Sequence, residues 1–484
     1  MPPSIRIEDL LAVTNGRLLA PTAVSDFAGA SVDSRRIVPG SLFVALAGER
    51  ADGHSFVPAA LGAGAVGALV ARPVPLPPET PGFLVQVHDP LLALQDLAAW
   101  WRSRFPVRVV GITGSTGKTL AKETVADVLS GGFRVLRNEG NLNSESGLPM
   151  TLLNLDATHE VAVLEMSMYT VGEIARLAEI ARPEVGVVLA VHPTHLERAG
   201  SVERIAQAKS ELPAALPADG LAVLNADDPR VAAMREVTRA EVRTFGLGPD
   251  ADVRATEVTS RGLEGTDFLL TAPWGQRRVR SGTPGRHLVP HALAAAAVAH
   301  RFGLPLEEVA VGLARGSGAS HRMQIIEAAS GATVIDDTYN ASPVSVRGAL
   351  EFLAETPVAA RRRRLAVLGD MLELGPDEER LHRELGAVAA SQLDALLAVG
   401  PRARWIAEGA SAAGLASVLT ADDTDQAILV LDRELAPGVG DLLLVKGSRG
   451  VELDRLVEAI AAAPVASRSV STAAPSATDG GGRC

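Results

Sequence analysis

The apolar residues of the chain fall into short continuous runs separated by longer stretches with helical spacing. Val107–Ile112, Val161–Glu165 and Leu221–Asn225 are runs of the kind found in strands buried on both faces of a sheet. Between two such runs, Val202–Leu212 carries its apolar residues at helical spacing. Because strands and helices alternate, we predict an α/β fold with mostly parallel sheets and helices on both faces.

Breaks in this pattern predict three domains and a tail. Residues 1–106 form the first domain, because a helical stretch over residues 91–104 ends just before Pro106. Residues 107–315 form a central domain, and residues 316–465 form a second α/β unit. Residues 466–484 contain Ser, Ala, Thr, Gly and Pro without periodicity, so we expect a disordered tail.

Several further elements follow from the same pattern. In the first domain we expect a strand within Ser41–Gly48, a helix over Phe56–Ala65 and an extended Pro-rich loop over Arg72–Pro81. The other expected elements are helices at 171–179, 291–302 and 377–393, and strands at 185–191, within 253–279, and at 333–336, 364–368, 395–399 and 441–445.

Charge and composition exclude some classes of function. The 484 residues carry a net charge of −11, which argues against a general nucleic-acid binder. The single cysteine, Cys484, excludes an intramolecular disulfide framework and a zinc cluster built on cysteines. No basic segment followed by an apolar core is found at the start, and no apolar stretch reaches the ~20 residues of a membrane helix. We therefore expect a cytoplasmic protein with no nucleic-acid partner and no membrane insertion.

A Gly-rich loop gives the first sign of chemistry. The segment Gly111–Thr119 reads Gly-Ile-Thr-Gly-Ser-Thr-Gly-Lys-Thr and lies between an expected strand and an expected helix. Backbone N–H groups in such a loop can surround a phosphate, Lys118 can neutralise phosphate charge, and Thr119 can bind Mg²⁺ through its hydroxyl. The common phosphate-loop pattern has a glycine where this chain has Ile112. The loop predicts nucleotide binding and leaves the reaction open.

Polar residues at the ends of other strands are weaker signals. Glu165 ends an apolar strand, where a carboxylate faces the crevice of a parallel sheet, although a surface glutamate is equally compatible. His195 follows a second strand. Lys209 lies on a helix, and composition alone predicts a solvated lysine there. In the third domain, Val334–Pro343 carries two carboxylates, a tyrosine and an asparagine at a strand end, and Arg322 lies shortly before it.

Taken in order, these pieces resemble the Mur ligase family, the ATP-dependent amide-forming enzymes of peptidoglycan precursor synthesis. The resemblance runs from about Ser31 to Leu456 and includes the motifs at 33–48, 52–56, 336–343, 368–375 and 446–449. The last three motifs are most similar to those of the member that adds D-Ala-D-Ala to UDP-N-acetylmuramoyl-tripeptide. The Asp-Asn-Pro-Arg motif of the diaminopimelate-adding member is absent.

The resemblance implies a uridine-nucleotide-binding first domain, a central P-loop domain that binds ATP, and a Rossmann-like third domain that acts as a lid. It implies two Mg²⁺ ions, with Thr119, Glu165, His195 and a carbamylated Lys209 as ligands. Lys118, Lys209, His195 and Glu165 would be catalytic. The implied ATP contacts are Gly114, Ser115, Thr116, Gly117, Lys118, Thr119, His291, Arg322 and Asp337. The implied substrate contacts are Ser34, Arg35, Asn141, Asn143, Tyr339, Asn340 and Ser342.

The chain departs from the family pattern at a few positions. Ala190 and Ser144 stand where the family usually has asparagine, and the helix start that contacts adenine reads Gly285-Arg-His-Leu-Val-Pro-His291. The phosphate, metal and carbamate residues are all retained, so we expect activity as a monomeric ligase.

Alternative functions remain at this point. They are another step of the same family that adds a single amino acid, a P-loop phosphotransferase acting on a small metabolite, and a binding protein that has lost the chemistry. The third residue of the tripeptide is not indicated by the sequence.

Overall fold

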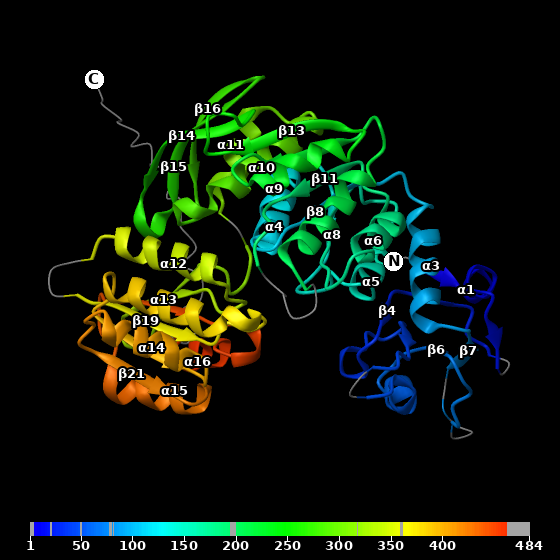
Figure 1. The fold of residues 1–484 in the computed structure, drawn as a ribbon. Helices are drawn as coiled ribbons and strands as arrows, with labels where there is room; N and C mark the ends of the chain where they lie inside the picture. The colour runs from blue at the N-terminus through cyan, green and yellow to red at the C-terminus, as the bar shows by residue number, and fades with distance from the viewer. Residues whose placement is uncertain are drawn as a thin grey trace, which may run out of the picture.

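Three bodies, each built around its own sheet, follow one another along the chain (Figure 1). The computed structural model describes residues 4–19, 22–48, 51–76, 80, 82–193, 200–316, 318–358 and 362–461. Within these ranges the sheets are mostly parallel and helices cover them, which confirms the predicted α/β class with three domains. None of the described helices is long and apolar enough to cross a membrane.

The N-terminal body contains a small sheet of order β2-β7-β6-β5-β4 and a two-stranded ribbon of β1 and β3. The Phe56–Ala65 helix prediction is only partly correct, because the helix ends at Gly62 and a strand begins at Gly67 within the same apolar run. Gly64, with φ +109°, provides the turn between them. The elements of the N-terminal body are β1 (Ile5–Arg6), α1 (Ile7–Thr14), β2 (Arg17–Leu18), β3 (Asp26–Phe27), β4 (Ala30–Ser31), β5 (Leu42–Val44), α2 (Val57–Gly62), β6 (Gly67–Val70), β7 (Phe83–Gln86) and α3 (Pro90–Arg102).

The central body has the largest sheet, of order β16-β15-β14-β13-β12-β11-β8-β10-β9 in the described residues. All pairings among β8 to β14 are parallel, whereas β15 and β16 form an antiparallel edge next to β14. Its elements are β8 (Arg108–Thr113), α4 (Lys118–Leu129), β9 (Val135–Arg137), α5 (Gly147–Leu152), β10 (Val161–Glu165), α6 (Glu173–Ala181), β11 (Val185–Val188), α8 (Val202–Ala214), β12 (Leu221–Asn225), α9 (Pro229–Ala232), β13 (Glu241–Gly246), β14 (Val253–Ser260), β15 (Thr266–Ala272), β16 (Gly275–Ser281), α10 (Val289–Arg301) and α11 (Leu306–Ala314).

The C-terminal body is a parallel sheet with one antiparallel edge, of order β17-β18-β22-β19-β20-β21. The expected disordered tail lies outside the described residues. The elements are β17 (Gln324–Glu327), β18 (Thr333–Asp336), α12 (Pro343–Glu355), β19 (Arg364–Gly369), α13 (Glu378–Ala390), β20 (Ala395–Val399), α14 (Ala403–Ala412), β21 (Val418–Ala421), α15 (Thr424–Val430), β22 (Leu442–Lys446) and α16 (Asp454–Ile460).

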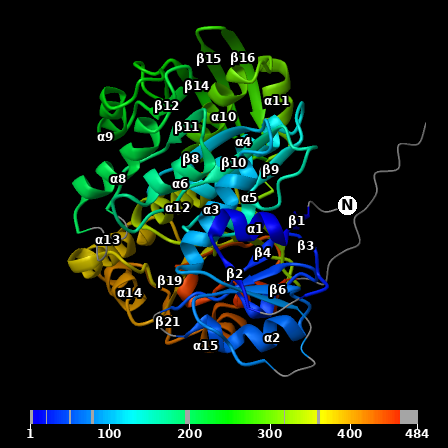
Figure 2. The same ribbon diagram turned by 90° about the vertical axis from the view of Figure 1, so that its right-hand side faces the viewer.

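The first two bodies share one hydrophobic core, whereas the third has cores of its own. Leu94 and Leu97 of α3 belong to the same buried cluster as Ile174 and Leu177 of α6. In Figure 2, α3 lies between the N-terminal sheet and the central helices. The clusters of the C-terminal body contain buried residues from that body alone, with Leu288 among the few central residues that contact them. The C-terminal body is therefore the one most weakly attached.

Candidate active site

Strand β8 is the centre of the site because the strands that follow it in the chain lie on opposite sides of it. β10 pairs with one edge of β8 and β11 with the other. The carboxyl ends of these strands meet at one edge of the sheet, which is where ligands bind in open α/β folds. The loop after β8, the end of β10 and the segment after β11 are therefore brought together.

The loop Gly114–Thr119 joins β8 to the start of α4, as the sequence predicts. Gly117 adopts the left-handed conformation with φ 77°, and a Cβ there would lie 2.2 Å from Nε2 of His291. Ser115 is fixed because its hydroxyl donates to the carbonyl of His192 and accepts from the N–H of the same residue. Lys118 Nζ donates to the carbonyl of Gly114 at 2.9 Å. The loop thus presents a helix N-terminus and a lysine at one place, an arrangement that binds phosphate.

Thr119 and Glu165 meet directly across the sheet edge. The Thr119 hydroxyl donates to Oε2 of Glu165 at 2.8 Å, and Asn143 Nδ2 donates to Oε1 of Glu165 at 2.6 Å. Glu165 is 2% exposed, so the surface-glutamate alternative is wrong. Asn141 lies two residues before Asn143 in the same loop and is exposed.

Lys209 lies buried beside this cluster. Helix α8 packs its Ala208 and Leu212 into the shared core, and Lys209 is 3% exposed. Burial, followed by the charge of Lys118, lowers the pKa of Lys209 well below its usual value, and the charge of Glu165 acts in the opposite direction. Burial also lowers the pKa of Lys118. The interpretation of Lys209 as a solvated helix lysine is therefore wrong.

A divalent cation fits these groups. Among the described residues no group of three or more His, Cys, Asp or Glu side chains converges on one point. Mg²⁺ does not need such a group, because it is usually held by one or two carboxylates together with substrate phosphates and water. The Thr119 hydroxyl and the Glu165 carboxylate, at the mouth of a phosphate loop, form this kind of donor set. His195 lies outside the described residues, so its predicted role as a ligand stays a prediction.

Arg322 connects the C-terminal body to the phosphate loop. Its guanidinium donates to the Thr119 hydroxyl at 2.8 Å and stacks over the ring of Tyr339 at 4.1 Å. The residues on either side, His321 and Met323, have φ of 58° and 52°, which are strained values for residues other than glycine. Nδ1 of His321 lies 2.7 Å from Oδ2 of Asp336, which holds this segment against β18. Arg322 thus reaches the site from a constrained backbone.

The remaining C-terminal candidates surround the end of β18. Asp337 is paired with the buried Lys446, whose Nζ lies 2.5 Å from Oδ2 of Asp337 and 2.8 Å from the carbonyl of Asn340. Burial lowers the pKa of Lys446 and the charge of Asp337 opposes this shift. Ser342 caps α12, since its hydroxyl accepts from the N–H of Ser345. In the sequence, Lys446 stands out only as the first residue of the 446–449 motif that resembles the family.

Two histidines at the start of α10 lie between the bodies. Burial lowers the pKa values of His287 and His291 to about 4, so both are neutral at pH 7. Nδ1 of His291 donates to the carbonyl of Leu288 at 3.1 Å, which leaves Nε2 as an acceptor facing Gly117.

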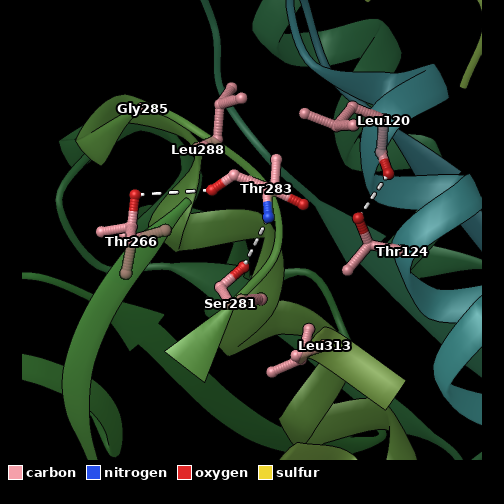
Figure 3. Close-up of a pocket in the computed structure, with 10 residues that line it drawn as sticks. Leu120, Thr124, Thr266, Ser281, Thr283, Gly285, Leu288 and Leu313 are labelled. Atoms are coloured by element: carbon pink, nitrogen blue, oxygen red, sulfur yellow. Dashed lines mark hydrogen bonds between the residues drawn. The ribbon is translucent and has the colours of Figure 1, made fainter. Parts of the chain in front are cut away.

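Two cavities lie near this helix start. One, of about 10 Å³, lies between α4 and the ends of β15 and β16 and is lined by threonine hydroxyls such as those of Thr124 and Thr266 (Figure 3). It has room for one water molecule and is too small for a nucleotide. The second, of about 240 Å³, lies between the central and C-terminal bodies and is lined by Thr283, Arg315 and Arg322 among others.

The predicted substrate residues of the N-terminal body lie apart from this cluster. Ser34 and Arg35 form a short 3₁₀ turn after β4, and Asp33 caps it. The Arg35 guanidinium pairs with Asp33 at 2.8 Å, and its side chain is 86% exposed. The side-chain hydrogen bond from Arg35 lowers the pKa of Asp33 to about 2. These residues are available for an anionic ligand on the surface.

Comparisons with known proteins match all three bodies. The Mur ligase family catalytic domain matches residues 26–102, the Mur ligase middle domain matches 112–299, and the Mur ligase glutamate ligase domain matches 321–449. The UDP-N-acetylmuramoyl-tripeptide–D-alanyl-D-alanine ligase of Escherichia coli is 36% identical over 94% of this chain and 98% of its own length. The protein of the same name from Mycobacterium tuberculosis is 41% identical over 89% of this chain and 91% of its own.

Solved structures agree with the sequence relatives. MurF from Acinetobacter baumannii superposes with a TM-score of 0.81 at 32% identity, covering 94% of this chain and 98% of that one. MurF ligase from Thermotoga maritima, solved with ADP, superposes with a TM-score of 0.75 at 30% identity, covering 89% and 96%.

Proposed function

We propose that this chain, which belongs to the Mur ligase family, joins D-Ala-D-Ala to UDP-N-acetylmuramoyl-tripeptide while ATP is converted to ADP and phosphate. The observation that carries the proposal is the likeness, over nine-tenths of the chain, to relatives that bear the name of this ligase. The contact of Thr119 with both Glu165 and Arg322 supports it, because two segments that are distant in the sequence converge on the phosphate loop. The nucleotide-linked substrate and ATP make the cytoplasm the site of the reaction, and we expect a monomer.

ATP would bind with its phosphates at Gly114–Thr119. The N–H groups of the loop and the N-terminus of α4 face the phosphate position, and Lys118 neutralises part of the charge. His291 and Asp337 would contact the nucleoside, on the central and C-terminal sides respectively. The related ligase from Thermotoga maritima was solved with ADP, which supports the proposal that this chain binds ATP.

Mg²⁺ would be held by Thr119, Glu165 and the phosphates, with His195 and a modified Lys209 as ligands of a second ion. When bound, the cations would neutralise the charge that accumulates on the transferred phosphoryl group. Glu165 is prepared for this role because Thr119 and Asn143 fix both of its oxygens.

Lys209 is suited to carbamylation. Its lowered pKa raises the fraction of the amine that is neutral, and a neutral amine can attack CO₂. The N–C bond forms, one proton is released, and the product is an N-carboxylate with a single negative charge. The modification would replace a cation that repels Lys118 with an anion that attracts it.

The reaction has two steps, each of which requires alignment. The terminal carboxylate of the tripeptide attacks the γ-phosphorus of ATP, the bond to the β-phosphate oxygen breaks, and an acyl phosphate and ADP form. The amine of D-Ala-D-Ala then attacks the acyl carbon, phosphate leaves, and the amine loses a proton. Lys118 and Arg322 stabilise the anionic transition state of the first step.

The other roles divide among the domains predicted at 1–106, 107–315 and 316–465. Ser34 and Arg35 would hold the uridine nucleotide, and Asn141 and Asn143 the peptide end of that substrate. Tyr339, Asn340 and Ser342 would receive the dipeptide from the C-terminal side. A closed C-terminal domain would exclude water, which would otherwise hydrolyse the acyl phosphate.

The test is phosphate release from ATP with UDP-N-acetylmuramoyl-tripeptide, measured with and without D-Ala-D-Ala, with the product identified by mass. We expect release that depends on the dipeptide and a product heavier by one dipeptide unit. Release that depends on a single amino acid would instead indicate another step of the family. A stable phosphorylated product would indicate a phosphotransferase, and no release with lysine- or diaminopimelate-containing tripeptide would contradict the proposal.

A further inference from the structure

Lys122 is a buried charge that the proposed reaction does not use. It lies one turn after Lys118 on α4 and is 0% exposed. Its Nζ pairs with Oε1 of Glu123 at 2.8 Å and donates to the backbone carbonyl of Asn138. Because an ammonium is costly to bury, its contacts must hold it firmly, and they join α4 to the segment that follows β9.

Asn138 is buried, with 1% of its surface exposed, and its side chain continues the pairing between β9 and β10. Strand β9 ends at Arg137, which pairs with Val163, whereas β10 continues to Glu165. The Asn138 amide pairs with the backbone of β10 beyond that point. Its Oδ1 accepts from the N–H of Glu165 at 3.0 Å, and its Nδ2 donates to the carbonyl of Glu165 at 3.2 Å.

The same amide also fixes the loop that follows. Nδ2 of Asn138 donates to the carbonyl of Leu142 at 2.8 Å, and the carbonyl of Asn143 accepts from the N–H of Ser167 at 2.9 Å. Asn143 then reaches Oε1 of Glu165. The loop that carries Asn141 and Asn143 and the end of β10 are consequently held as one unit.

We propose that Lys122 and Asn138 are positioning residues that hold the Glu165 carboxylate and the 139–146 loop at a fixed place relative to Thr119. Lys122 and Thr119 are on the same helix, three residues apart, so the Lys122–Asn138 contact connects the helix that carries the hydroxyl to the unit that carries the carboxylate. Neither side chain touches substrate in this scheme. Their effect is on the geometry of the two oxygens assigned to Mg²⁺ and, through Asn143, on the peptide end of the acceptor. The inference rests on the proposed function for the assignment of Mg²⁺ to these two oxygens and for its kinetic readout.

Asn138→Leu tests the proposal, because leucine has the same branched shape and the same number of side-chain heavy atoms but forms none of the three hydrogen bonds. Lys122→Met is the second variant and removes the two contacts of the ammonium, with Glu123 and with the carbonyl of Asn138, while the Asn138 side chain stays. Thr244→Val is the matched control, since Thr244 is a buried residue of the same sheet that hydrogen-bonds to Asp252, far from β10. All three variants should lose some stability, which thermal unfolding measures. An effect that follows the loss of stability alone should also appear in Thr244→Val.

The decisive measurement is the affinity for ADP by calorimetry, in EDTA and in Mg²⁺. Wild type and Thr244→Val should both bind ADP more tightly in Mg²⁺ than in EDTA. Asn138→Leu should bind ADP in EDTA as tightly as wild type does, but its gain in affinity on adding Mg²⁺ should be smaller by roughly 10- to 100-fold. Lys122→Met should show a smaller loss in the same direction. In turnover, Asn138→Leu should need more Mg²⁺ and show a raised KM for the tripeptide substrate.

An unchanged Mg²⁺ effect in a folded Asn138→Leu protein would overturn the inference. If that variant does not fold, an unchanged Mg²⁺ effect in Lys122→Met would do the same. A wild-type protein that binds Mg²⁺·ADP but forms no amide would contradict the proposed function and leave the positioning test intact.

Discussion

Arg322 offers the most direct test of how the C-terminal domain takes part. Its guanidinium donates to the Thr119 hydroxyl at 2.8 Å and lies 4.1 Å from the centre of the Tyr339 ring. A hydrogen bond from a charged donor contributes about 1.5–3 kcal/mol, and a cation–π contact contributes about 0.5–2 kcal/mol. Arg322→Ala therefore removes roughly 2–5 kcal/mol of interaction.

If this energy is available in the transition state, the loss in kcat is roughly 30- to 3,000-fold, since about 1.4 kcal/mol corresponds to a factor of ten. The KM for ATP should change less than kcat, because the charge on the phosphoryl group is greatest during transfer. The assay is steady-state phosphate release with both substrates saturating. Arg286→Ala is the control, since Arg286 also pairs with a C-terminal residue, Glu355, but only at 3.8 Å. A kcat for Arg322→Ala within threefold of wild type would refute this reasoning.

Three further predictions address the phosphate loop and its neighbours. Lys209→Ala should remove nearly all turnover while leaving ADP binding in EDTA intact, and recovery with added formate or acetate would indicate that an anion is needed at this position. Gly117→Ala should abolish nucleotide binding measured by calorimetry, because φ is 77° and the new Cβ would lie 2.2 Å from His291 Nε2. Normal ADP affinity would contradict that reading. The free energy of unfolding in urea should fall as pH drops from 6.5 to 4, because His287 and His291 have folded-state pKa values of about 4 and the unfolded chain binds these protons first. The loss is up to about 3 kcal/mol for each histidine, and His291→Gln should lose less free energy of unfolding over this range.

The strands that carry the site could be predicted because they are buried on both faces. Val161–Glu165 reads as a continuous apolar run, and all five residues are buried. Short edge elements gave no comparable signal. Strand β9 has three residues, all at least partly exposed, and strand β6 lies within a run that also carries a helix. The pattern of apolar residues predicts an element when the element's own residues are buried. It fails when contacts with neighbouring elements determine the conformation.

The site residues divide in the same way. Lys118 and Thr119 could be found because the phosphate loop depends on residues adjacent in sequence. Composition predicts a solvated Lys209, but the residue is buried. Which side of α8 is buried depends on how the helix packs over β8 and β11, and the sequence of the helix alone does not show this. The role proposed for Asn138 also depends on packing, since its partners are Leu142 and Glu165. No local feature of the sequence indicates this role.

The distribution of the hydrophobic cores explains why the C-terminal domain can supply the last components of the site. The N-terminal and central domains share one buried cluster, so Ser34 and Arg35, which we propose bind the uridine nucleotide, are held at a fixed distance from the phosphate loop. The C-terminal domain keeps its own clusters and approaches the centre through polar contacts such as that of Arg322. Polar contacts at a cleft exchange with water at little net cost, whereas a shared apolar core does not separate without losing its burial. We therefore expect the C-terminal domain, with Arg322 and Tyr339, to move, and the two domains proposed to hold the tripeptide carboxylate and the ATP phosphates to stay rigid relative to each other. In the proposed reaction, this division would let the acyl phosphate form beside the rigid domains and meet the amine only when the third domain is in place.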